Sequence, residues 1–469
     1  MRISLKKMLS ISLFGIFVTV YTIILLSKRS YFVDMAVVRY VCISAFVVLA
    51  LEVLASYRIS NVFLTPSILF LMAFYVFQNG QLLLLALGID FNSFYINTLN
   101  QYTQDVAIYS SISSVVAGYA CLICTKENCS IENKIEPINY SIDKLNPDRV
   151  AQIAYVGFIG TTLIAVPLVF VKFFFVRIGG YTAVRNLESS IPSIVNFLEY
   201  MFFPFVLLIQ IYDKQKRSNI AAVFAVIWLI LTALCGDRTT GIAGLAVLAY
   251  LRMSILSHPK RGNLFKTLII AVLLLIFIDI SYIVRTRGSF SDLSIGLGLF
   301  TGFLSELGFS CFPLYTMMHT VPQYEGFRYG IGYLFSFIGG MIPSFIDPTG
   351  TIRNVNAQAH IFEAWHSRYF SQYSFGFGFS LNAESYINFG WFGLIGIFIV
   401  CLIVFHFLGG SHIKNSKSNW ALYRMCVLLF LWFTLPRRDS YYIWKAISYA
   451  LIIMQIYIKV GMSFCQKKN

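Results

Sequence analysis

The chain has 469 residues, of which 58% are hydrophobic and only 12% are charged. A soluble domain carries about 25% charged residues, so this composition excludes an ordinary soluble protein. The net charge of +15 comes largely from Lys and Arg in short segments between apolar runs, a pattern that sets membrane topology and requires no nucleic-acid partner.

Apolar runs of about 20 residues, the length that crosses the hydrocarbon core of a bilayer, recur along the chain. We therefore predict an all-α polytopic membrane protein with about twelve transmembrane helices. The predicted spans are 8–27, 36–55, 62–88, 105–124, 150–172, 192–212, 219–236, 239–256, 265–284, 387–408, 419–436 and 441–460.

An even number of spans places both termini on one side of the membrane. The basic N-terminus, the basic runs 214–218, 258–263 and 414–417, and the basic C-terminus then share that side. The excess of Lys and Arg marks it as the cytoplasm. Three segments are predicted to lie outside: 173–191, the junction 236–241, and a long insertion.

The insertion divides the chain into three parts. Residues 1–284 hold nine predicted spans, 285–386 form a large periplasmic insertion, and 387–469 hold the last three spans. Within the insertion, 293–318 is apolar enough to span the membrane. Because a further span would move the C-terminal basic runs outside, a re-entrant or surface-lying helix is the preferred interpretation.

Arginine residues gather at the predicted outer face. Arg238 opens one membrane helix, and Arg285 and Arg287 follow the end of another. Arginine at such a depth needs a partner, and its planar guanidinium binds phosphate oxygens in a bidentate way. A diphosphate is one such partner, and pairing with Asp237 or Asp279 is the alternative. Further candidates for substrate binding in the insertion are Arg328, Arg353 and Arg368.

Two histidines in the insertion, His360 and His366, are candidates for a general base. They stand six residues apart, whereas two metal ligands on one helical face need a spacing of four. We also see no acidic cluster outside that would hold a cation. The sequence therefore predicts no metal and no cofactor.

The last segment of interest runs from Gly376 to Gly393 and re-enters the membrane. Ser380, Glu384 and Asn388 are four residues apart and share one helix face. Glu384 is a third candidate for the base, and Asn388 and Tyr386 are candidates for sugar binding. Gly390 and Gly393 are expected to allow close helix packing.

Three motifs resemble those of bacterial oligosaccharide repeat-unit polymerases, the O-antigen polymerase (Wzy) family. They are Gly236-Asp237-Arg238 at the start of a helix, Arg285-Thr286-Arg287 at a helix exit, and the run from Gly376 to Gly393. The resemblance covers about residues 236–408. It implies a membrane glycosyltransferase with a GT-C-like layout.

The resemblance further implies an undecaprenyl-diphosphate-linked oligosaccharide as substrate, the lipid bilayer as surroundings and a polysaccharide chain-length regulator as a possible partner. It implies an inner-membrane location with the site facing the periplasm. An O-antigen ligase is the alternative within the same chemistry. A lipid-linked oligosaccharide flippase is the alternative from another class, although few ionisable residues lie within the predicted spans.

Overall fold

A computed structural model describes most of the chain. The described residues are 5–29, 33–61, 65–89, 101–125, 145–213, 216–252, 276–277, 280, 297–343, 345–347, 349, 351, 379–408 and 418–466. Within them all regular structure is helical, which confirms the predicted all-α class.

Ten of the described helices are long and apolar enough to cross a membrane. They confirm ten of the predicted spans, whereas 265–284 lies largely outside the described residues. The membrane helices of the N-terminal half are α1 (Leu5–Ser27), α2 (Met35–Ser60), α3 (Pro66–Leu87), α4 (Gln101–Cys124), α5 (Pro147–Ser190), α6 (Ser193–Tyr212), α7 (Lys216–Leu234) and the shorter α8 (Arg238–Tyr250).

The C-terminal half contains shorter and interrupted helices. Its elements are α10 (Leu297–Gly308), η3 (Phe309–Cys311), α11 (Phe312–Thr320), α12 (Ile331–Met341), α15 (Leu381–Phe389), η4 (Gly390–Phe392), α16 (Gly393–Leu408), α17 (Asn419–Trp432), η6 (Leu435–Arg437), α18 (Tyr441–Ala446), the π-helical η7 (Ile447–Ile453) and α19 (Met454–Gln466).

Two predicted boundaries differ from the structure. The span predicted at 239–256 is helical from Arg238 to Tyr250, and its part beyond residue 252 lies outside the described residues. The outer segment 173–191 is helical as far as Ser190, since α5 continues through a single non-helical residue, Gly180. The span predicted at 387–408 begins at Leu381, because Ser380 caps α15 by accepting a hydrogen bond from the backbone of Ala383.

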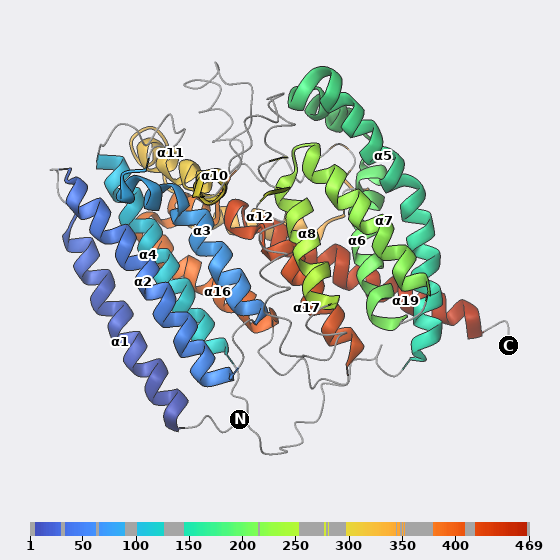
Figure 1. Ribbon diagram of the computed structural model, residues 1–469, viewed down its shortest axis with the longest axis horizontal. Coiled ribbons are helices and arrows are strands. Elements are labelled where there is room, and N and C mark those ends of the chain that lie inside the picture. Colours follow the sequence, from blue (N-terminus) through green and yellow to red (C-terminus); the bar gives the residue numbers. More distant parts are fainter. Residues whose placement is uncertain are drawn as a thin grey trace.

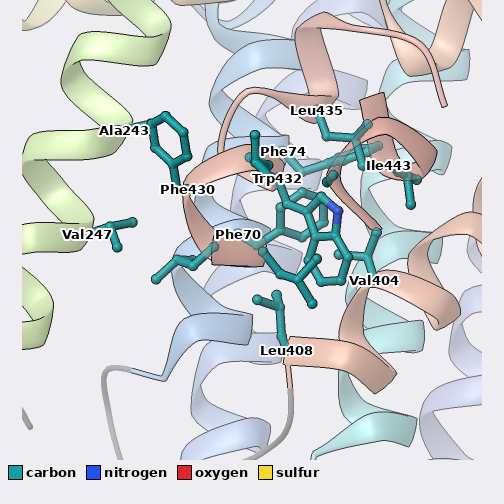
Figure 2. Close-up of a cluster of buried hydrophobic side chains, with 14 of the residues drawn as sticks. Phe70, Phe74, Ala243, Val247, Val404, Leu408, Phe430, Trp432, Leu435 and Ile443 are labelled. Atoms are coloured by element: carbon teal, nitrogen blue, oxygen red, sulfur yellow. The ribbon is translucent and has the colours of Figure 1, made fainter. Parts of the chain in front are cut away.

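The apolar core joins the two halves of the chain. Figure 2 shows Phe70 and Phe74 of α3 packed near Val404 and Leu408 of α16 and near Trp432 of α17. In Figure 1 the blue and cyan helices α1–α4 stand on one side and the green helices α5–α8 on the other, with α12 between them and α17 beside α8. The elements of the C-terminal half therefore connect the two helical groups.

Part of the long insertion is packed into this bundle. Helix α10 lies against α3, where a Cβ atom added to Gly80 would come within 2.6 Å of the Leu304 carbonyl oxygen. Gly308 meets the α3 backbone in the same way. From Leu297 on, the apolar segment predicted at 293–318 forms two helices, α10 and α11, joined by η3.

Candidate active site

Glu384 is the centre of a buried polar cluster in the C-terminal half. It lies in the first turn of α15 and is fully buried. The Ser440 backbone N–H donates to Glu384 Oε2 at 2.7 Å, and the Ser440 hydroxyl donates to Oε1 at 2.7 Å. The Ser336 hydroxyl of α12 donates to Oε1 at 3.2 Å. A buried carboxyl with these hydrogen bonds fixes α15, α12 and the segment before α18 relative to one another.

The segment that Glu384 binds is the junction between α17 and α18, residues 435–440. We call it the C-terminal junction. It is held from the opposite side by Gln78 of α3, whose side-chain Nε2 donates to the Pro436 carbonyl oxygen at 2.6 Å. Two buried side chains from different helices therefore fix the backbone of a short loop that carries Arg437, Arg438 and Asp439.

Arg438 extends from this junction toward the start of α8. Its Nη2 donates to the Thr240 hydroxyl at 3.4 Å and lies 3.7 Å from Asp237 Oδ1. Its guanidinium carbon lies 4.3 Å from the centre of the Tyr442 ring, a cation–π arrangement. The side chain as a whole is 25% exposed.

The partner of Arg438 belongs to the Gly-Asp-Arg junction predicted from the sequence. Asp237 caps α8, accepting a hydrogen bond from the Thr240 backbone at 3.2 Å, and Arg238 is the first residue of that helix. The Arg238 side chain lies outside the described residues. The predicted pairing of Arg238 with Asp237 or Asp279 therefore stays a prediction, whereas the described partner of Asp237 is Arg438 of the C-terminal junction.

Asp439 lies next to Arg438 and is almost fully buried. Burial raises the pKa of its carboxyl to about 6, although the Arg438 guanidinium acts in the opposite direction. Glu384 lies close enough to interact with it electrostatically. The cluster thus combines two carboxyl groups and at least one guanidinium in a setting of low dielectric.

The structure also places three other predicted residues beside Glu384. Arg328 donates its backbone N–H to the Ile387 carbonyl at 3.0 Å. The Asn388 side chain donates to the Glu384 carbonyl at 2.8 Å and accepts from the Gly332 backbone at 3.2 Å. These contacts hold the segment that enters α12 against α15. The Tyr386 ring packs against that of Phe327, with centres 6.3 Å apart.

The two glycines of the re-entering motif also contact neighbouring groups closely. A Cβ atom on Gly393 would lie 2.3 Å from the Ser385 carbonyl oxygen and 2.7 Å from the hydroxyl of Tyr109 on α4. Gly390 has a φ of +58°, which disfavours other residues, and it faces the Phe327 ring. Both observations agree with the predicted close packing.

The remaining predicted site residues lie outside the described residues: Arg285, Arg287, Arg353, His360, His366 and Arg368. Their assignment as substrate-binding or catalytic groups stays a prediction. Among the residues that the structure does describe, no group of three or more His, Cys, Asp or Glu side chains is placed to hold a metal ion.

Sequence reasoning missed Arg438, Asp439 and Ser440. A signal was present, because the predicted spans 419–436 and 441–460 leave only four residues, Arg-Arg-Asp-Ser, between them. The predicted topology puts this junction on the same side as Arg238. Three charged residues in a four-residue junction at the predicted outer face indicate a functional position, as the arginines earlier in the chain do.

Comparison with known proteins identifies the family. The family model described as O-antigen polysaccharide polymerase Wzy matches residues 8–469, which is nearly the whole chain. A search of curated proteins and a search of solved structures returned no match. The match extends through the N-terminal half, beyond the motifs that carried the resemblance. The chain is a multi-pass membrane protein of polysaccharide biosynthesis and belongs to the O-antigen polysaccharide polymerase Wzy family.

Proposed function

We propose that this polymerase joins polyprenyl-diphosphate-linked oligosaccharide repeat units at the periplasmic face of the bacterial inner membrane, with undecaprenyl as the polyprenyl. The observation that carries the proposal is the meeting of three segments in one cluster. Glu384 of the re-entering motif binds the C-terminal junction, and Arg438 of that junction contacts Asp237 of the Gly-Asp-Arg motif.

The cluster suits a diphosphate because its guanidinium groups are only partly neutralised. Asp237 lies 3.7 Å from one nitrogen of Arg438, too far for a strong charge-assisted hydrogen bond. Arg437 and Arg238 are adjacent in sequence to this pair and carry positive charge at any working pH. A diphosphate would bind the guanidinium of Arg438.

The reaction needs stabilisation of negative charge as the diphosphate leaves. Donors that are already fixed before the reaction stabilise this charge most strongly where water is excluded. The C-terminal junction meets this condition, since Gln78 and Glu384 hold its backbone from two sides. The arginines of the insertion, Arg285, Arg287, Arg328, Arg353 and Arg368, are proposed to bind the diphosphate and the saccharide from outside.

The test is polymerisation by the purified protein. Protein in lipid nanodiscs is given a synthetic polyprenyl-diphosphate repeat unit, and the products are separated by length. We expect a ladder of glycans on the lipid carrier, formed without a second compartment. A protein that only moves the lipid across a bilayer would leave single repeats in this assay.

A second arm separates polymerase from ligase. Lipid A core is added as a competing acceptor, and the reducing end of the product is identified. A polymerase transfers the chain to another lipid-linked repeat and ignores lipid A core. Transfer to lipid A core with no elongation would show ligase activity and would contradict the proposal.

A further inference from the structure

Asp439 carries a carboxyl oxygen that the described structure leaves without a partner. The residue is 6% exposed. The backbone N–H groups of Asp439 and Tyr441 stabilise its carboxylate, but its Oδ1 atom has no hydrogen-bond partner among the described residues. A buried carboxylate oxygen without a donor is costly, so natural proteins satisfy nearly all such atoms. An unsatisfied one inside a cluster of charged residues marks the place where a ligand donates.

The neighbouring carboxyl, Glu384, has a different environment. It receives three hydrogen bonds, two from Ser440 and one from Ser336. Each bond positions the C-terminal junction or α12. A carboxylate that accepts these hydrogen bonds is suited to hold the C-terminal junction in place. It is poorly placed to accept a proton from a substrate hydroxyl. Of these two carboxyl groups, Asp439 is the one with an oxygen, Oδ1, that has no described hydrogen-bond partner.

We propose that Asp439 is the catalytic base of the glycosyl transfer, an assignment that rests on the proposed function. The attacking sugar hydroxyl gives its proton to Asp439 Oδ1. The hydroxyl oxygen forms a bond to the anomeric carbon of the donor, and the bond from that carbon to the diphosphate oxygen breaks. The diphosphate leaves with the electron pair, and no other reactant is needed.

The backbone separates the base from the group that binds the diphosphate. Arg438 has an extended conformation, with φ −133° and ψ 172°. In extended chain, successive side chains point to opposite sides. Arg438 turns toward Asp237 of α8, whereas Asp439 lies close to Glu384 of α15. The dipeptide Arg438-Asp439 therefore directs its guanidinium toward α8 and its carboxylate toward α15.

The charged surroundings of Asp439 set its pH dependence. Glu384 faces it from α15 and Arg438 from the same junction, while Asp237 of α8 and the phenols of Tyr200 and Tyr442 surround Arg438. Burial raises the pKa of Asp439 to about 6, and Arg438 limits the rise. A base must be deprotonated, so the rate should increase as the pH rises through about 6 and stay constant above it.

The test measures polymerisation rates of Asp439→Asn in nanodiscs with the synthetic lipid-linked repeat. We expect kcat to fall by at least about 100-fold with little change in KM, because a general base contributes about 10²–10⁴ in rate. Asp439→Glu should keep part of the rate with a displaced acid limb. Asp34→Asn is the matched control, since Asp34 only caps α2 and asparagine caps equally well.

The assignment is overturned if Asp439→Asn keeps more than about a tenth of the wild-type kcat, a smaller loss than a base gives. It is also overturned if Asp439→Glu leaves the acid limb where it was, or if the loss follows a lower unfolding temperature. These results would leave polymerisation by the wild-type protein intact. If the wild-type protein makes no polymer, the proposed function fails and the base assignment fails with it.

Discussion

Among the described residues, two carboxyl groups are fully buried in membrane helices, Glu52 in the N-terminal group of helices and Glu384 beside the C-terminal junction. Glu52 receives one described hydrogen bond, from the Tyr75 hydroxyl at 2.9 Å, and its carboxyl packs directly against Gly118 of α4. Glu384 receives three described hydrogen bonds, and it lies near Asp439.

The difference shows how to interpret a buried acid in a membrane protein. An acidic residue at this depth is expensive, so it is a candidate for function by default. The surroundings of Glu52, a phenol and a glycine, fit a neutral acid that fills space between α2, α3 and α4. The surroundings of Glu384, with further charges on a fixed loop, fit a site where charge changes during a reaction.

Among the variants that test this comparison, the largest effect is expected at Arg438. Replacing it with alanine removes the described guanidinium that faces the proposed diphosphate, and we expect polymerisation to fall by about 100- to 1,000-fold, as for loss of one preorganised donor. Arg438→Lys should recover only part of this loss, since an ammonium lacks the bidentate fork. The readout is the rate of glycan elongation.

The matched control for Arg438 is Arg217→Ala. Arg217 lies near the beginning of α7, with its guanidinium 5.3 Å from the Tyr155 ring centre. Its loss should leave the elongation rate unchanged. Equal losses in both variants would mean that total positive charge matters and that the C-terminal junction has no special role.

The two buried acids can be compared directly by the same substitution. Glu384→Gln weakens charge-assisted hydrogen bonds from Ser440, which are worth about 1.5–3 kcal/mol, so elongation should fall about 10- to 100-fold. Glu52→Gln should change the rate by less than about twofold, because Tyr75 can donate to the amide oxygen as it does to a neutral acid. Equal effects at the two positions would remove the distinction drawn between them.

The space around Glu52 offers a test of stability. A Cβ atom on Gly118 would lie 1.9 Å from the Glu52 carboxyl carbon, so Gly118→Ala should lower the free energy of unfolding by about 1–3 kcal/mol. Glu52→Ala should relieve part of this cost in the double variant. Thermal unfolding in detergent measures both. Gly160→Ala in α5, where no atom lies within 4 Å, should be neutral or stabilising.

The smallest effect is expected beside Glu384. Tyr333 of α12 shares a hydrogen bond of 2.5 Å with the Ser385 hydroxyl. Tyr333→Phe should cost about 0.5–1.5 kcal/mol of stability, the net worth of one such bond, and should leave elongation nearly unchanged. A large loss of activity here would extend the site from the junction to α12.

Much of the fold could be predicted because long apolar runs have few alternatives to spanning a bilayer. The predicted helix boundaries were wrong where a single residue caps or bends a helix. The capping hydroxyl of Ser380 starts α15 earlier than hydropathy suggests, and one glycine bends α5 without ending it. Hydropathy measures neither of these local signals.

The site was only partly predictable for a related reason. Glu384 and Asp237 could be identified as polar residues at a predicted membrane face. Their partners on the C-terminal junction, Arg438 for Asp237 and Ser440 for Glu384, lie 54 or more residues further along the chain from Glu384. Which helices bring such segments together depends on side-chain packing, as in the contact of Gln78 with Pro436. A single sequence does not record these contacts.

The bond from Gln78 to the Pro436 carbonyl also fixes how deep the C-terminal junction lies. Gln78 is nine residues before the end of α3 at Leu87. At 1.5 Å per residue the junction sits about 13 Å below that end of the helix. Under the proposed function, the carrier diphosphate would bind Arg438 about 13 Å along α3 from its Leu87 end. Polymerisation in nanodiscs should then depend on the thickness of the bilayer.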